Sequence, residues 1–228
     1  MRPETKSLNR RLTLRQVALV LLALLLVAMG NWAACQWIAA RLLAARVEAA
    51  LPKICAQLRA DRHVLVTAIN AYKAHFGSCP PDHLLGKSPL SVDPITNTLI
   101  YELFGTIHNP DLHTYTPQGL EEADEQEVRR YFQCDRFKNC GERLGQIIRF
   151  LGPLPLLVRK VQKGPDIFLP GSHIPDEGYA PGVFTQIQIS SWRYVCSAPT
   201  NNPLQFDLWV ELKTGTKTQT LGNWQAVD

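Results

Sequence analysis

An uncharged stretch near the N-terminus constrains this chain more than any other feature. From Gln16 through Ala40 there is no Asp, Glu, Lys, Arg or His, and the centre reads VALVLLALLLVAM. As a helix, this stretch is long enough to cross a hydrocarbon core of roughly 30 Å. A helix buried in a soluble protein would normally carry a polar stripe, and none is present before Asn31. We therefore predict a transmembrane helix over residues 16–40.

Residues 1–15 form a basic arm in front of this helix. Its charged residues are Arg2, Lys6, Arg10, Arg11, Arg15 and one acid, Glu4. An excess of basic residues holds a flanking segment in the cytoplasm, so residues 41–228 are expected outside. Residues 16–228 carry 19 basic and 19 acidic side chains. This balance argues against a nucleic-acid partner, which requires a clustered basic surface.

Two processing alternatives remain open. A cleaved signal peptide would have its basic region in the arm and a cut near Ala28-Met29-Gly30. Against it, the apolar run is longer than the core of a usual signal peptide, and no turn signal follows. Lipid attachment at Cys35 is the second alternative, but Trp32 stands where a lipid-attachment motif has an aliphatic residue.

The chain has six cysteines, which suits a compartment where disulfides form. Six cysteines allow fifteen pairings. Cys134 and Cys140 could close a small loop, and Cys79 with Cys196 is the expected second pair. Cys35 and Cys55 are interpreted as small apolar residues.

An amphipathic helix is predicted over residues 41–77, continuous with the transmembrane segment. Its apolar residues recur at steps of three, four or seven: Val47, Leu51, Ile54, Leu58, Leu65, Ile69, Tyr72 and Phe76. Gly77 and the pair Pro80-Pro81 supply a stop. The combined helix of roughly 60 residues would be about 90 Å long.

Residues 78–182 give weaker signals. The run LIYELF (99–104) is interpreted as a strand. Residues 107–182 are interpreted as a helical or irregular insertion. Within it, Asp124 and Glu127 stand at capping-box spacing before a short helix, and residues 144–151 predict a second one.

The C-terminal quarter, residues 183–224, predicts a small antiparallel sheet. Apolar and polar residues alternate from Thr185 to Ser190 and from Leu204 to Lys213, and Gly215 offers a tight turn into KTQTL. The apolar face of this sheet should cover the apolar stripe of residues 47–76, because neither apolar surface is stable when exposed to water. The fold class is therefore α+β, with a long N-terminal helix packed on a C-terminal sheet.

No catalytic motif supports an enzyme. The sequence lacks a phosphate-binding loop, a dinucleotide fingerprint, a nucleophile elbow and a zinc-protease helix. We therefore expect a non-enzymatic protein with no cofactor and no metal. On the sheet, Trp192, Tyr194 and Trp209 are candidate binding residues, although aromatic residues on strands more often pack in the core.

The order of these elements resembles type IV pilin-like proteins, specifically the major pseudopilins of type II secretion. Three strings carry the resemblance: the helix end LVTAINAYKAHFGSCPPD, the turn DPITNTLIYEL and the ending FDLWVELKTGTKTQTLGNW. The matching positions are Ile69, Tyr72, Gly77, Pro80, Asp93, Pro94, Asn97, Tyr101, Asp207, Gly222, Asn223 and Trp224. They fall in about the first 105 residues and the last 30 or so.

The chain also departs from the family. Arg11 stands where family precursors have glycine before a cut, and Gln16 replaces the glutamate that opens the family's apolar helix. Cleavage and ordinary filament assembly are therefore in doubt. The calcium loop of the major pseudopilins is not clearly retained, because only Asp207 and Glu211 offer carboxylates there.

The resemblance implies a single-pass protein of the bacterial inner membrane, with its head in the periplasm. It would be a structural or accessory subunit of a type II secretion or type IV pilus-type machine. Its expected partners are the lipid bilayer and other pilin-like or secretion-system subunits. The alternative is a signal-anchored periplasmic enzyme or ligand-binding domain with its pocket in residues 107–182.

Overall fold

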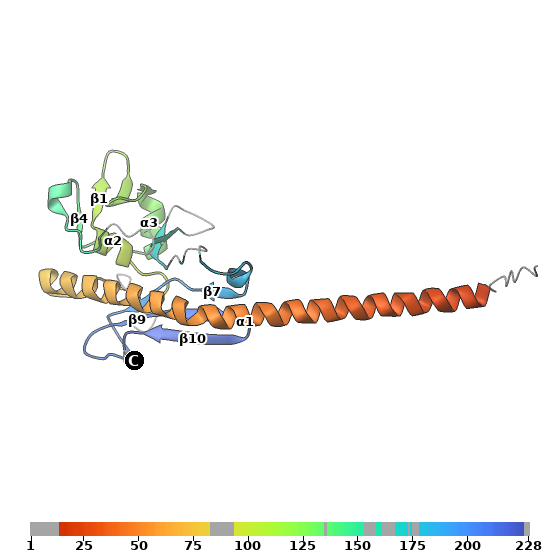
Figure 1. Ribbon diagram of the computed structural model, residues 1–228. Helices are drawn as coiled ribbons and strands as arrows, with labels where there is room; N and C mark the ends of the chain where they lie inside the picture. The colour runs from red at the N-terminus through yellow and green to blue at the C-terminus, as the bar shows by residue number, and fades with distance from the viewer. Residues whose placement is uncertain are drawn as a thin grey trace, which may run out of the picture. The chain divides into compact units, whose positions relative to one another are not determined.

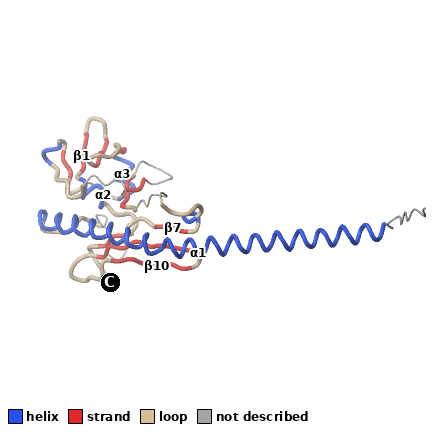
Figure 2. Tube along the Cα trace, viewed as in Figure 1, coloured by secondary structure: helices blue, strands red, loops and turns tan. Residues whose placement is uncertain are grey.

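The structure is a computed structural model that describes residues 14–82, 94–134, 136–152, 158–160, 167–172, 174 and 178–225. The chain divides into two compact units, residues 1–48 and 49–228. Helix α1 (Leu14–Phe76) contributes to both units, as Figures 1 and 2 show. The fold is α+β, as predicted: a long apolar N-terminal helix is followed by sheets.

In the second unit, α1 buries the predicted apolar stripe. Ile54, Leu58, Leu65, Ile69 and Tyr72 are all fully buried. The helix ends one residue earlier than predicted, at Phe76, and Gly77 follows with φ +74°. A left-handed residue at this position is a common helix stop, and glycine adopts it without strain.

The C-terminal sheet has the strand order β10-β9-β7, with β8 also paired to β9. Its strands are antiparallel: β7 (Ile187–Ile189), β8 (Arg193–Val195), β9 (Asp207–Thr214) and β10 (Lys217–Gly222). Gly215 makes the predicted turn between β9 and β10, at φ +56°. A short 3-10 helix (Val183–Thr185) precedes β7, so the predicted strand begins later than expected.

This sheet packs against α1 within the second unit, as predicted. Arg62 on α1 donates a hydrogen bond to the carbonyl of Gly222 on β10. Leu208, Val210 and Leu212 on β9 are buried. A second layer, which was not predicted, lies on the other side of the helix in Figure 1. Phe76 packs against Phe150 there, with 5.9 Å between ring centroids, so the end of α1 contacts this layer as well as the C-terminal sheet.

The second layer corrects two predictions. Residues 99–104 form helix α2 (Leu99–Phe104) instead of a strand, with all six side chains buried. The predicted insertion contains a sheet of order β3-β2-β1-β4, where β1 pairs antiparallel with β2 and parallel with β4. Its strands are β1 (Thr106–Asn109), β2 (Thr114–Pro117), β3 (Ala123–Asp124) and β4 (Cys140–Gly141).

The remaining elements are short. Helix α3 (Glu125–Phe132) begins as predicted, because the Asp124 side chain accepts a hydrogen bond from the amide of Glu127. The helix predicted at 144–151 is wrong. Only Leu144–Gln146 form one 3-10 turn, and Ile147 is extended. Strands β5 (Val158–Lys160) and β6 (Phe168–Pro170) pair with each other.

Candidate functional site

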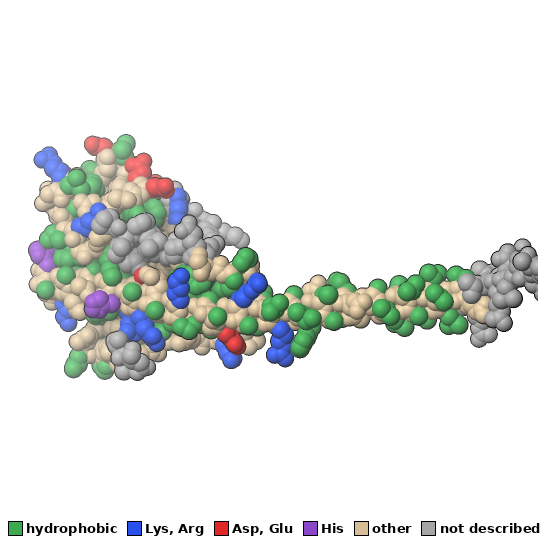
Figure 3. Space-filling model, in the orientation of Figure 1, with side chains coloured by type: hydrophobic (Ala, Val, Ile, Leu, Met, Phe, Trp, Pro, Cys, Tyr) green, Lys and Arg blue, Asp and Glu red, His purple; other side chains and the backbone are tan. Residues whose placement is uncertain are grey.

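In the part of the chain that the structure describes, exposed large apolar side chains are concentrated on α1 in the first unit. Figure 3 shows apolar side chains covering this part of the helix. Its exposed large residues are Val17, Leu19, Val20, Leu21, Leu22, Leu24, Leu25, Leu26, Val27, Met29, Trp32, Trp37, Ile38 and Leu42. Among the described residues, this is the one helix long and apolar enough to cross a membrane. A surface of this kind is not stable in water and marks a site for lipid or other proteins.

The side chains of Trp37 and Arg41 lie together where the uncharged part of this helix ends. The guanidinium of Arg41 lies over the ring of Trp37, 5.2 Å from its centroid. The two residues are one helical turn apart, which places their side chains on the same face. Tryptophan and arginine together are typical of the boundary between lipid tails and headgroups.

The family-like residues of the second unit form two structural clusters. The first joins the end of α1 to α2. The hydroxyl of Tyr72 donates to Glu102 at 2.8 Å. The backbone amides of Lys138 and Asn139 also donate to that carboxylate, at 2.7 and 2.9 Å. Tyr101 is buried next to this group and stacks on Phe137, with 4.7 Å between ring centroids.

The turn after α1 is held to the C-terminal sheet. The hydroxyl of Tyr194 donates to the carbonyl of Pro80 at 2.9 Å, and its amide donates to the carbonyl of Pro94 at 3.0 Å. The Asn97 side chain donates to the carbonyl of Trp192 at 3.0 Å. Trp192 and Tyr194 are therefore core residues and not a binding surface. Asp93, another family-like position, lies outside the described residues.

The second cluster lies at the end of β10 and joins it to the start of β9. Asn223 accepts from the amide of Leu208 at 2.9 Å and donates to the carbonyl of Phe206 at 2.9 Å. Trp224 packs edge-on against Trp209, with 5.8 Å between ring centroids. A side chain at Gly222 would meet the Trp224 ring at 2.6 Å, which explains a glycine at that position.

The calcium site implied by the resemblance does not fit this arrangement. The buried Asp207 carboxylate accepts hydrogen bonds from the backbone amides of Thr200, Asn201 and Asn202. These N–H groups occupy carboxylate lone pairs that a cation would need. Glu211 pairs instead with Arg193. Within the described residues, no group of three His, Cys, Asp or Glu side chains could hold a metal ion.

All six cysteines are thiols in the structure. The side chains of Cys79 and Cys196 interact with each other, which lowers the pKa of Cys79 and raises that of Cys196. Their pairing as a disulfide stays a prediction. The pairing of Cys134 with Cys140 stays a prediction. Cys55 is buried and Cys35 is exposed on α1.

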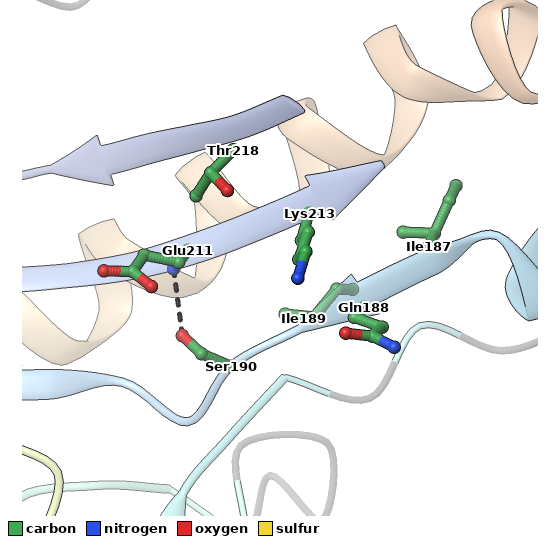
Figure 4. A pocket seen from close by; sticks show the side chains of 7 residues that line it. All are labelled: Ile187, Gln188, Ile189, Ser190, Glu211, Lys213 and Thr218. Carbon is green, nitrogen blue, oxygen red and sulfur yellow. Dashed lines mark hydrogen bonds between the residues drawn. The ribbon is translucent and has the colours of Figure 1, made fainter. Parts of the chain in front are cut away.

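A shallow hollow of about 550 Å³, shown in Figure 4, lies across strands β7, β9 and β10 of the C-terminal sheet. Its lining residues are Ile187, Gln188, Ile189, Ser190, Glu211, Lys213 and Thr218. Gln188, Lys213 and Thr218 are register partners across three strands, and the amide of Glu211 donates to the Ser190 hydroxyl at 2.9 Å. These side chains are mostly polar and lie on an open surface. The hollow therefore does not form an enclosed binding or catalytic site.

A second hollow, of about 350 Å³, lies in residues 107–182 and was missed from the sequence. His108 and His113 each place a ring nitrogen beside Glu125, at 3.2 and 3.3 Å, and Arg129 contacts the same carboxylate at 2.6 Å. Partial desolvation would raise the pKa of Glu125, but these cationic and hydrogen-bonding neighbours lower it. The β1–β2 pairing brings the two histidines together. The only sequence signal was their short spacing on either side of a turn.

No known protein family, curated protein sequence or solved structure matches this chain. Any functional proposal for this chain therefore rests on the geometry of the described residues. They provide an exposed apolar helix, a second unit held together by hydrogen bonds and apolar packing, and open hollows on that unit.

Proposed function

We propose that this chain is a membrane-anchored, non-enzymatic, pilin-like subunit of a type II secretion or type IV pilus-type envelope machine. The observation that carries the proposal is the change in environment along α1. Residues 17–42 expose apolar side chains on every face, whereas residues 54–72 bury one face against a sheet. A membrane anchor alone needs only the first property. A pilin-like subunit needs both.

The physical mechanism is association. Fully burying one large apolar side chain contributes roughly 1.5–3 kcal/mol. Moving the exposed face of α1 into lipid, or packing it on similar helices, is therefore strongly favourable. In a bilayer, packing between helices depends on close contact and not on escape from water. The head, defined as residues 41–228, would then give partner specificity through its enlarged second layer.

The proposed location is the bacterial inner membrane, with the arm of residues 1–15 in the cytoplasm and the head in the periplasm. The excess of Arg and Lys in this arm supports that orientation. Arg11 and Gln16 further support a resident accessory subunit over a filament building block. An uncleaved arm keeps the chain in the membrane, and Gln16 cannot neutralise the N-terminal amine of a neighbour.

Protease accessibility in spheroplasts tests the orientation. Added protease should degrade the head while a tag at the N-terminus stays intact, and the chain should resist extraction by alkaline carbonate. The variant Leu22→Arg/Leu25→Arg should lose this resistance, because each charge at the centre of a span costs about 2.5–3.5 kcal/mol. The control Gln57→Arg lies outside the span and should keep it. A head protected in spheroplasts would contradict the proposal.

The hollow beside Glu125 favours a second candidate, a signal-anchored periplasmic ligand-binding domain. Its walls offer a carboxylate, two imidazoles and a guanidinium, which suit a small polar ligand. A thermal-shift screen against periplasmic small molecules separates the candidates. A hit lost in Glu125→Gln and retained in Glu121→Gln would favour this alternative, since Glu121 does not line the hollow.

A further inference from the structure

The end of α1 and the end of β8 meet at two cysteines. Cys79 is the third residue after the helix and is buried, and Cys196 directly follows β8. Their side chains are close enough to interact, and each changes the pKa of the other. The sequence alone allows fifteen pairings of six cysteines, and the geometry brings this pair into contact.

Backbone and side-chain hydrogen bonds hold the two segments together on both sides of the thiols. The hydroxyl of Tyr194 donates to the carbonyl of Pro80 at 2.9 Å. The Asp82 carboxylate accepts from the backbone amides of Cys196 and Ser197, and from the Ser197 hydroxyl at 3.1 Å. These bonds fix the residues next to each sulfur, so little chain movement is needed to join the sulfurs.

We propose that Cys79 and Cys196 form a disulfide that fastens the end of α1 to the C-terminal sheet once the head has been exported. The pairing itself rests on the contact above, and only its oxidising compartment rests on the proposed function. The bond would form by thiol–disulfide exchange with a disulfide-bonded donor, such as glutathione disulfide or an exported oxidoreductase. Each cysteine gives up one proton and one electron, the sulfur–sulfur bond forms, and the donor leaves as two thiols.

The surroundings favour this pair over the other cysteines. The interaction with Cys196 lowers the pKa of Cys79, which favours the thiolate that reacts in exchange. Burial instead raises the pKa of Cys55, and raises that of Cys140 to about 11. A thiol kept protonated reacts slowly in exchange, so Cys79 is the more reactive partner.

The disulfide would cross-link two segments that are far apart in sequence, which restricts the unfolded chain strongly. Losing it should lower the melting temperature of the full chain in detergent micelles by about 10 °C. The variants Cys79→Ser, Cys196→Ser and the double variant should all show the same decrease, because each removes one bond. Adding reductant should bring the wild type to the same value, and Cys55→Ser serves as the control that keeps the reductant effect. Additive effects of the two single variants would overturn the proposal.

Peptide mapping of the alkylated, non-reduced full chain tests the bond directly. Two samples are compared: protein isolated from cell membranes, and protein reduced and then reoxidised in micelles with a glutathione buffer. A peptide pair joining Cys79 to Cys196 is expected in both. Free thiols at both positions in the reoxidised sample overturn the pairing. A bond in the reoxidised sample with free thiols in the cellular one supports the pairing and contradicts the exported head.

Discussion

The guanidinium of Arg62 donates a hydrogen bond of 2.5 Å to the carbonyl oxygen of Gly222. Arg62 lies on α1 and is 8% exposed, and Gly222 ends β10. Burial lowers the pKa of Arg62, and the charge of Arg59 lowers it further. The bond therefore joins helix and sheet through a buried, charge-assisted contact, the kind that is costly to break.

Replacing Arg62 tests this contact. Arg62→Met keeps the apolar part of the side chain but leaves the Gly222 carbonyl with only the longer bond from the Gln225 amide, at 3.4 Å, so the full chain should lose about 1 kcal/mol of stability or more. Arg59→Met is the matched control, because Arg59 is an exposed residue of the same type on the same helix. Urea unfolding in detergent, followed by tryptophan fluorescence, measures both. Equal effects of the two variants would show that the helix is not held to the sheet in this way.

The ionisation of Glu102 should make the stability of the folded chain depend on pH. Burial raises its pKa, although the amides of Asn139 and Lys138 and the Tyr72 hydroxyl oppose the shift. A carboxyl with a raised folded-state pKa binds its proton more tightly in the folded chain. Its contribution is therefore complete below its ordinary pKa of 4.5 and is lost as pH rises through the folded pKa.

The variant Glu102→Gln removes this titration. The stability of the wild type minus that of the variant should fall as pH rises from about 4.5 towards the raised folded-state pKa, by up to about 1.4 kcal/mol per pH unit. Unfolding curves of both proteins across this range give the difference. A difference that stays constant or increases with pH would contradict the buried carboxyl.

The elements with clear periodicity were predictable from the sequence. The stripe from Ile54 to Tyr72 fixed both the helix and the face that it buries, and Gly77 marked its end. The alternation along β9 identified the sheet that covers it. Asp124 supplied the cap of α3 because its side chain acts locally, on an amide three residues away.

The second layer was not predictable, for a physical reason. Residues 99–104 are buried on every side, so the run has no period and cannot distinguish a short helix from a strand. The sheet formed by β1 to β4 uses strands of two to four residues, too short for alternation to show. The hollow at Glu125 depends on the pairing of β1 with β2, which no local pattern reveals.

The two tryptophans of the first unit should lie at different depths in a bilayer. They are five residues apart, so Trp32 should lie about 7.5 Å deeper along the helix than Trp37. In vesicles of brominated phospholipids, Trp32→Phe should lose the component quenched by deep bromines, and Trp37→Phe the component quenched near the headgroups. Trp209→Phe, in the second unit, should change neither. Loss of the deep component in Trp37→Phe would place the bilayer differently.

The basic arm should remain on the mature protein. Under the proposed resemblance to pilin-like proteins, Arg11 stands where their processing enzyme requires glycine, and the charged arm is costly to move through a bilayer. N-terminal sequencing of the membrane fraction should find residues of the arm. The variant Arg11→Gly restores the family pattern and should be cut if the cell contains that enzyme. A mature start at Leu12 in the wild type would contradict this prediction and assign the chain to the filament.

The central claim is that the apolar helix packs on other pilin-like subunits. Site-specific photo-crosslinking in cells tests it most directly, with the reactive residue at Leu25 and a control at Leu204, both exposed in the structure. The adducts are identified by mass spectrometry. We predict that Leu25 crosslinks to a membrane protein that itself begins with an uncharged helix of this length, and that Leu204 does not. Adducts of Leu25 with lipid alone would contradict the claim.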